Sequence, residues 1–277
     1  PPTLQGPLAV NRDLQEGRRI FAGQLKGPES FTADADGRCV ASTGWRQGVL
    51  WVGNPKHMPL IGLEIHMECL PCGALNSSSS AGSHSGLEHG SRSAQCEYKL
   101  ICAYYLNGVC VSHLGVDGIP FKFLNGLEIS RNGTVFFTDS SSKWGRRHHR
   151  YELIAGNLAV RMLAYDPATR RVRAVLDGLY MANGIAFSPE EDYLLIAETS
   201  VARILRFWLK GPNAGRTEIF IDNMPGYPDN IRLTDRGTFL VGISTTRFPG
   251  FLRPFLDLIG PHPALKRFIA KVREICV

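Results

Sequence analysis

Five side chains with hard oxygen atoms occur at the start of similar short sequence motifs, here called phrases. They are Glu29, Asn125, Asn183, Asp229 and Asn230. Their two carboxylates supply the negative charge that balances a divalent cation, and their three amides supply neutral oxygens. Ca²⁺ takes roughly six to eight oxygen ligands at irregular geometry, whereas Zn²⁺ and copper favour nitrogen and sulfur. The donor set therefore predicts a calcium site.

The phrases that carry these residues predict the fold that positions them. Each phrase runs from an oxygen-bearing residue through an alternating apolar segment and a tight turn into a strongly β-prone strand. The copies span residues 29–37, 125–133, 183–191 and 230–237 and indicate a repeat of about 47 residues. Because equivalent positions of a β-propeller lie at equal height around its channel, the five side chains would converge there.

The copy that begins at Asn183 shows the repeat most completely. Its alternation predicts four strands, at 184–187, 193–198, 202–209 and 216–221. Four strands per repeat is typical of a propeller blade. A β-sandwich of unrelated hairpins is the alternative, but it gives no reason for one polar residue type at one phase.

Longer stretches of the chain resemble the strictosidine synthase-like family. The most specific are Val135-Phe-Phe-Thr-Asp-Ser-Ser-Ser-Lys-Trp144 and Asn223-Met-Pro-Gly-Tyr-Pro-Asp-Asn-Ile-Arg232, within a match over roughly 1–37 and 121–272. The resemblance implies an all-β, six-bladed β-propeller whose channel calcium is held by residues matching the five named above. Many relatives carry Asp after the first Asn, where this chain has Gly126, which argues against a second ion.

The resemblance also implies an activity, the hydrolysis of aryl esters or lactones. A channel calcium polarises the carbonyl of such a small-molecule substrate while water attacks it. The candidates for the general base are His148 and His149, in a basic insertion of the third blade. Strictosidine synthase-type condensation is not expected, because its catalytic Glu lies in the last blades. The alternative function is a non-catalytic, calcium-stabilised propeller that serves as a membrane-anchored interaction domain.

Residues 38 to about 120 differ from their surroundings, because they are rich in Cys, His and Ser and lack the expected phrase. Three explanations compete. Cys69 and Cys72 could bind zinc together with Cys96, Cys102 or His. The segment could instead be a disulfide-bearing insertion. The third explanation, which we favour, is that the segment is not native propeller sequence, so that blade two is disrupted and few regular strands form.

The two ends predict an incomplete chain that forms one propeller domain over residues 1–277. We expect the end of blade five and all of blade six to be missing. We also expect a membrane anchor ahead of residue 1 in the complete protein, with the propeller lumenal or extracellular in the endoplasmic reticulum or at the cell surface. Two sequons, at Asn76 and Asn132, would then be glycosylation acceptors.

The net charge of +6 does not by itself indicate a nucleic-acid partner. The basic clusters, such as 146–150, lack interleaved aromatic residues and a nucleic-acid-binding motif. We therefore predict solvated loops at these positions and no nucleic acid. The sequence does not predict an oligomeric state.

Overall fold

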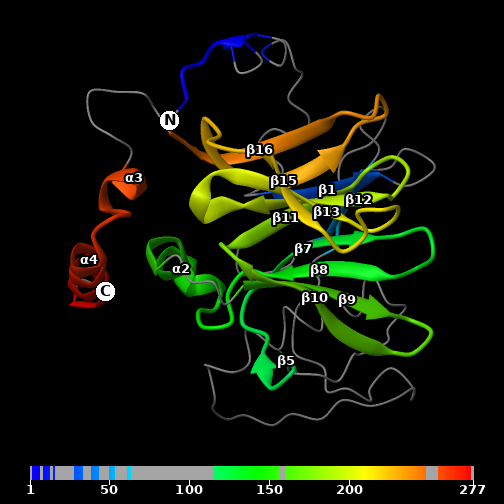
Figure 1. Cartoon of the computed structure of the whole chain (residues 1–277), viewed down its shortest axis with the longest axis horizontal. Helices are drawn as coiled ribbons and strands as arrows, with labels where there is room; N and C mark the ends of the chain where they lie inside the picture. Colours follow the sequence, from blue (N-terminus) through cyan, green and yellow to red (C-terminus); the bar gives the residue numbers. More distant parts are fainter. Residues whose placement is uncertain are drawn as a thin grey trace. The chain divides into compact units, whose positions relative to one another are not determined.

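The computed structural model describes two compact units, in which β-strands are the main regular element (Figure 1). The smaller unit is Val10–Glu88, and the larger joins Pro1–Ala9 to His89–Val277. The all-β prediction is confirmed at this level, whereas closure into six blades and a single domain over 1–277 remain predictions. The described residues are 2–6, 9–12, 15, 28–33, 39–43, 50–53, 61–63, 115–155, 160–247 and 255–275.

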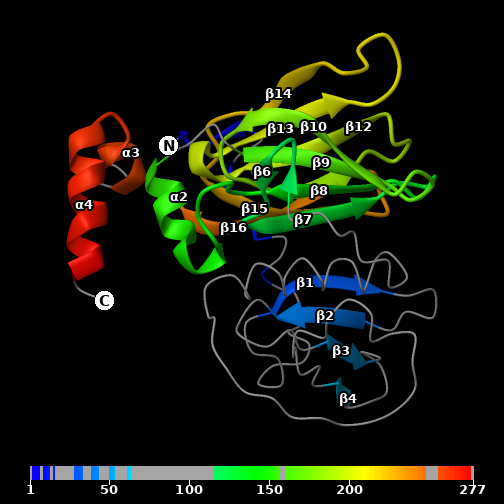
Figure 2. The same ribbon diagram turned by 90° about the horizontal axis from the view of Figure 1, so that it is seen from below.

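The smaller unit contains one antiparallel sheet with its four strands in chain order (Figure 2). The strands are β1 (Pro28–Ala33), β2 (Cys39–Thr43), β3 (Leu50–Gly53) and β4 (Ile61–Leu63). Three of these strands, at 39–43, 50–53 and 61–63, fall in the segment 38–120 where the sequence predicts few regular strands, so the described residues there pair regularly. Paired residues such as Val40 and Val52 are β-branched and favour strands. The predicted sites at Cys69, Cys72, Asn76, Cys96 and Cys102 lie outside the described residues.

The larger unit contains two four-stranded antiparallel sheets, a two-stranded sheet that follows them in the chain, and a small two-stranded hairpin that precedes them. The strand bounds confirm the four strands predicted after Asn183 to within two residues. The first sheet comprises β7 (Leu124–Ile129), β8 (Val135–Asp139), β9 (Val160–Asp166) and β10 (Arg171–Leu179). The second comprises β11 (Ala182–Phe187), β12 (Tyr193–Glu198), β13 (Arg203–Trp208) and β14 (Thr217–Ile221), and the third β15 (Gly226–Leu233) and β16 (Phe239–Thr246).

Short elements join and flank these sheets. A small hairpin, β5 (Gly115–Val116) and β6 (Ile119–Pro120), precedes the first sheet. The connections after β8 and β12 hold the helices η3 (Arg146–His148), α2 (His149–Ala155) and η4 (Thr199–Val201). Two helices follow β16, namely α3 (Phe255–Ile259) and α4 (Pro263–Ile275).

The three sheets of the larger unit pack face to face through apolar side chains. Phe136 of the first sheet meets Phe187 of the second edge to face, with ring centroids 5.6 Å apart. Ile185 and Ile196 lie in the same core cluster, whereas Ile231 of the third sheet packs in a further cluster on the second sheet. Successive sheets therefore stack in chain order, which is the arrangement of adjacent propeller blades.

The first strands of these sheets, β7, β11 and β15, lie side by side, and we call them the inner strands. Arg232 on β15 reaches Glu128 on β7, with 3.5 Å between Nη1 and Oε1. This ion pair crosses over the middle strand, β11, whose residue at the equivalent pairing position is the small Ala186. Side chains on the two outer strands can meet across a middle strand only if the three strands form a concave surface on that side. The inner strands therefore curve around a common line.

The inner strands approach one another backbone to backbone at two glycines. A Cβ added to Gly126 would lie 2.3 Å from the carbonyl oxygen of Asn183, and one added to Gly184 would lie 2.6 Å from the Cα of Asn230. Thr138 bridges the first of these contacts, because its hydroxyl accepts from the Gly126 N–H and donates to the Asn183 carbonyl, each over 2.8 Å. A side chain at either glycine would separate the strands.

In the larger unit, each four-stranded sheet ends its second strand with a fully buried carboxylate that pairs with an arginine on the third strand. Asp139 lies opposite Arg161, with 3.4 Å between Oδ2 and Nη2, and Glu198 lies opposite Arg203 in contact with its Nε. Asp139 also accepts the backbone N–H of Phe123 over 3.0 Å. These pairs secure the segment that enters each inner strand.

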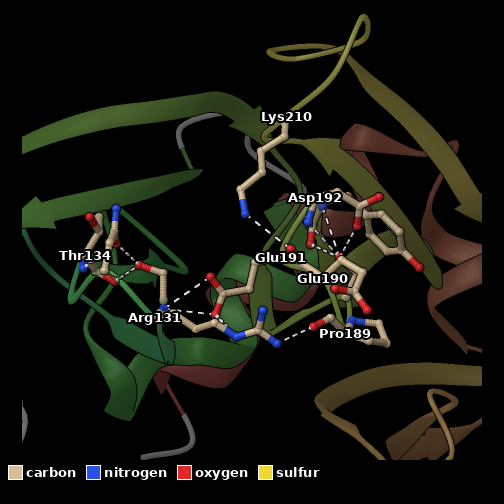
Figure 3. A network of polar contacts seen from close by, with 11 residues as sticks. Arg131, Thr134, Pro189, Glu190, Glu191, Asp192 and Lys210 are labelled. Atoms are coloured by element: carbon tan, nitrogen blue, oxygen red, sulfur yellow. Dashed lines mark hydrogen bonds and ion pairs between the residues drawn. The ribbon is translucent and has the colours of Figure 1, made fainter.

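A polar contact also joins the first two sheets at the ends of the inner strands that lie away from Asn125 and Asn183 (Figure 3). The Arg131 side chain donates to the Pro189 carbonyl over 2.7 Å, and its backbone N–H donates to the Glu191 carboxylate over 2.9 Å. Both groups belong to turns between first and second strands. Because the Arg131 side chain is 70% exposed, the ion pair stabilises little, and the backbone hydrogen bond fixes the turns.

We predict that Asp139 makes stability fall as pH rises. Burial raises the pKa of Asp139 from 3.8 to about 6 and outweighs the opposing effects of Arg161 and the backbone N–H groups. The folded state then holds the proton more tightly than the unfolded state, so this group's stabilisation is present below pH 3.8 and lost as pH rises to about 6. Relative to Asp139→Asn, which does not titrate, the wild-type free energy of unfolding should fall by about 3 kcal/mol across that interval. Urea unfolding at several pH values measures it, and a difference that stays constant or grows with pH contradicts it.

We also predict that Gly126→Ala destabilises the protein, because the new methyl group would meet the Asn183 carbonyl at 2.3 Å. The expected cost is about 3 kcal/mol, since backbone rather than a flexible side chain has to move. Gly242→Ala is the matched control, because its Cβ would lie 3.6 Å from the Asn230 carbonyl, an ordinary contact. Thermal unfolding compares the two variants. Equal melting temperatures would show that the strands do not approach this closely.

Candidate metal centre

The first strands β1, β7, β11 and β15 carry the same irregularity, at the residues predicted to bind metal. The pairing register with the second strand shifts there, which leaves an extra residue on the first strand, a β-bulge. The shifts fall between Pro28 and Ser30, Leu124 and Leu127, Ala182 and Ile185, and Pro228 and Ile231. Glu29, Asn125, Asn183, Asp229 and Asn230 all lie within these bulges. Because a bulge turns a side chain away from strict alternation, the repeat gives each sheet one re-aimed oxygen donor at the same place.

The pairing corrects the predicted phase of the last copy by one residue. Leu127, Ile185 and Ile231 hold the same pairing position after the bulge. Asp229, rather than Asn230, is therefore equivalent to Asn183, and Asn230 is equivalent to Gly126 and Gly184. The sequence-based alignment of this copy was one residue off, because Asp229 and Asn230 both carry a side-chain oxygen and this copy lacks the Asn-Gly pair.

Asn183 presents a side-chain oxygen that no hydrogen bond satisfies. The residue is 5% exposed, and its Nδ2 donates to the Thr199 hydroxyl over 3.2 Å. That hydroxyl uses its only hydrogen on the Pro228 carbonyl, 2.7 Å away, so it can only accept from Asn183. The amide orientation is thereby fixed, and Oδ1 remains buried without a hydrogen-bond partner. A buried amide oxygen of this kind costs free energy unless a donor or a cation meets it.

The structure brings four of the five predicted residues onto the three neighbouring inner strands. Asn125 and Asn183 hold equivalent places on β7 and β11, and Asp229 holds the corresponding place on β15. Glu29 belongs to the smaller unit, so its approach to the other four remains a prediction. Convergence of all five side-chain oxygens on one point also remains a prediction.

The chemistry of the donors separates calcium from softer metals. In the described part of the chain, no three His, Cys, Asp or Glu side chains gather around a possible metal position. A site on the inner strands would therefore depend on the amides of Asn125 and Asn183 together with the carboxylate of Asp229. Oxygen-only sets of this kind suit Ca²⁺. The residues present fit the ion that the sequence predicts.

The two histidines proposed as general base lie on the connection after β8 rather than on an inner strand. The exposed His148 ring stacks on Tyr151, with centroids 5.9 Å apart. The Nδ1 atom of His149 lies 3.0 Å from the Arg146 carbonyl, within the same helical turn. These contacts are those of a local helical turn. A catalytic role for either residue remains a prediction.

The sequence analysis missed the hydroxyl groups that join neighbouring sheets. Ser140 donates to the Ala182 carbonyl, and Thr199 donates to the equivalent Pro228 carbonyl. Each hydroxyl directly follows the buried acid that ends a second strand. The signal was therefore present as Asp139-Ser140 and Glu198-Thr199, an acid followed by a hydroxyl at the end of two matching strands.

A buried carboxylate on α2 was also missed. Glu152 is 1% exposed and accepts a hydrogen bond from the Ser141 hydroxyl. The same hydroxyl accepts the Trp144 backbone N–H over 2.7 Å. This network secures α2, which contacts η4 at the Thr199 end of the second sheet. A lone Glu in a seven-residue helix gave no sequence signal for this role.

The predicted glycosylation acceptor Asn132 lies beyond the end of β7, in the exposed turn to β8. Its Oδ1 accepts the Thr134 backbone N–H over 3.1 Å. The exposed position suits modification, which remains a prediction.

Two family models match stretches of this chain, and several solved structures are similar to it. A family model described as strictosidine synthase matches residues 125–212, and one described as strictosidine synthase-like, N-terminal, matches residues 6–45. Among solved structures, a gluconolactonase from Xanthomonas campestris is similar at 15% identity and TM-score 0.39, over 78% of this chain and 56% of that chain. The calcium-binding protein regucalcin from Agrobacterium tumefaciens is similar at 19% identity and TM-score 0.34, over 43% of this chain and 37% of that chain.

Curated relatives extend the match along the whole chain. Adipocyte plasma membrane-associated protein from Homo sapiens is 36% identical over 288 residues, which cover 98% of this chain and 66% of that protein. The Rattus norvegicus protein of that name is 35% identical and is covered to 73%. The chain thus spans about two thirds of the length of these relatives, and the alignments include residues 38–120, which were expected to match nothing. The chain belongs to the strictosidine synthase-like family.

Proposed function

We propose that the inner strands hold a calcium ion and that the complete site hydrolyses aryl esters or lactones. The observation that carries the proposal is the buried Oδ1 of Asn183, which is fixed in orientation and lacks a hydrogen-bond partner. Asn125, Asp229 and Asn230 stand on the neighbouring strands, and Glu29 occupies the corresponding bulge of the smaller unit.

The protein's own residues would prepare this site before an ion arrives. Thr199 holds the Asn183 amide so that its oxygen, not its nitrogen, is available. Gly126 and Gly184 let the inner strands approach until their bulges are neighbours. Asp229, with Glu29, would supply the charge that balances a divalent cation. Gly126, where many relatives carry Asp, argues against a second ion.

Such a site supports ester hydrolysis through charge stabilisation. A bound calcium ion with an open position supplies a Lewis acid that polarises a carbonyl and stabilises the developing oxyanion. The carbonyl carbon also needs a water molecule and a base to accept its proton. His148 and His149 remain the candidates for that base.

One observation favours the second candidate function, a non-catalytic propeller stabilised by calcium. His148 and His149 make contacts within their own helical turn and lie off the inner strands. A protein without a base at the channel mouth would bind the ion for stability and present its loops to a partner. The activity of the whole protein is therefore a proposal in both forms.

A membrane location belongs to the same proposal. The relatives are named plasma membrane-associated. No helix in the described ranges is long and apolar enough to cross a bilayer. We propose that the complete protein is membrane-anchored, with this part lumenal or extracellular and Asn132 accessible for glycosylation.

Replacing Asp229 tests the calcium proposal. Asp229→Ala removes one of two carboxylates from the set, so we expect Ca²⁺ affinity to fall at least roughly tenfold. Isothermal titration calorimetry and the calcium-induced rise in melting temperature measure it. Asp235→Ala is the matched control, because Asp235 is exposed in the turn at the other end of β15. Equal affinities for the two variants, or no calcium binding by the wild type, would contradict the proposed site.

Hydrolysis of phenyl acetate, measured on the same proteins with and without chelator, separates the two functions. Loss of turnover in Asp229→Ala and in chelator supports the hydrolase. Calcium binding without any calcium-dependent turnover supports the non-catalytic propeller.

A further inference from the structure

Helices α3 and α4 form a segment that is fixed to the sheets along one side. Arg247, after β16, donates to the Asp257 carboxylate over 2.7 Å, and the Tyr227 hydroxyl lies 3.4 Å from the same carboxylate. Ile259 is 1% exposed, and Leu256 packs against the core cluster that contains Ile231. This segment therefore has a defined position on the third sheet.

The other side of the segment exposes large apolar side chains. Leu258 is 51% exposed, Leu265 is 39% exposed and Phe268 is 64% exposed. Leu265 and Phe268 are three residues apart on α4 and therefore share one face of that helix. Single exposed apolar residues are common, but here two of them share one face of α4, and Leu258 is exposed on the helix that precedes it.

Positive charge borders this apolar face. Arg267 and Lys271 are exposed on α4, and Lys266 is half-buried. No Asp or Glu occurs from His262 to Arg273 in the sequence. An exposed apolar face bordered by Lys and Arg is typical of a helix that lies in the plane of a membrane surface. With 13 residues, α4 is too short to span a bilayer.

We propose that the α3–α4 segment docks on an anionic lipid bilayer. Leu258, Leu265 and Phe268 would enter the boundary between head groups and acyl chains. Arg267 and Lys271 would lie at the level of the lipid phosphates. A second copy of the chain fits this surface less well, because symmetric contact would bring the same positive charges together, and the α4 sequence holds a single acid, Glu274, against four Lys and Arg residues.

Vesicle co-sedimentation of the full chain tests the proposal. We expect binding to phosphatidylcholine vesicles that contain about one third phosphatidylserine, and much weaker binding to phosphatidylcholine alone or at high salt. Phe268→Ser should lower the partition coefficient roughly tenfold, because the aromatic side chain no longer enters the bilayer. Lys271→Gln should lower it about fivefold, because one cation near the surface is lost.

Matched variants elsewhere keep the test specific. Leu240→Ser removes an apolar side chain that is 54% exposed on β16, and Arg171→Gln removes an exposed cation on β10. Both should bind vesicles as the wild type does, and circular dichroism should show all four variants folded. No binding to the anionic vesicles overturns the proposal, and so does equal binding by Phe268→Ser and Leu240→Ser. A concentration-dependent dimer that Phe268→Ser dissociates would assign the face to a second copy instead.

Discussion

The close approach of the inner strands is the constraint on which the rest of this structure depends. At Gly126 and Gly184 the backbone of one strand occupies the space that a side chain on its neighbour would fill. Hydroxyl groups then complete the contact, because Thr138 and Thr199 each donate to a carbonyl of the next inner strand. Away from these first strands, neighbouring sheets are separated by apolar side chains. Two buried clusters fill the space between the first and second sheets and between the second and third.

The same constraint places the polar residues of the candidate site. A bulge in each first strand lies at the point of closest approach, so Asn125, Asn183 and Asp229 sit on adjacent strands at one level. The buried acids Asp139 and Glu198 hold the segments that lead into β7 and β11 through backbone N–H groups. The buried carboxylates of Asp139 and Glu198 and the unsatisfied Oδ1 of Asn183 each lower the free energy of unfolding, and all lie near one end of the inner strands. Several destabilising polar groups gathered in one place are typical of a ligand-binding site.

Sequence pattern alone predicted the strands well because their periodicity is local. The pattern after Asn183 placed four strands within two residues, since strand propensity and turn residues are local properties of the sequence. It failed at Asp229 and Asn230, because choosing between two oxygen-bearing neighbours requires the pairing of β15 with β16. It also missed Thr199 and Glu152, whose roles arise from contacts between separate elements. The segment after residue 38, predicted to be irregular, begins with paired strands. The prediction missed them because the unusual composition of the segment obscured an ordinary β-pattern.

We propose that the buried Oδ1 of Asn183 is a cation ligand shared with Asp229. Crystals soaked in a lanthanide that replaces Ca²⁺ test this most directly, because anomalous scattering locates the ion without reference to activity. The account predicts one strong peak about 2.5 Å from Asn183 Oδ1 and from an Asp229 carboxylate oxygen. A peak elsewhere, or an ordered water molecule donating to Asn183 Oδ1 in the presence of saturating calcium, would contradict it.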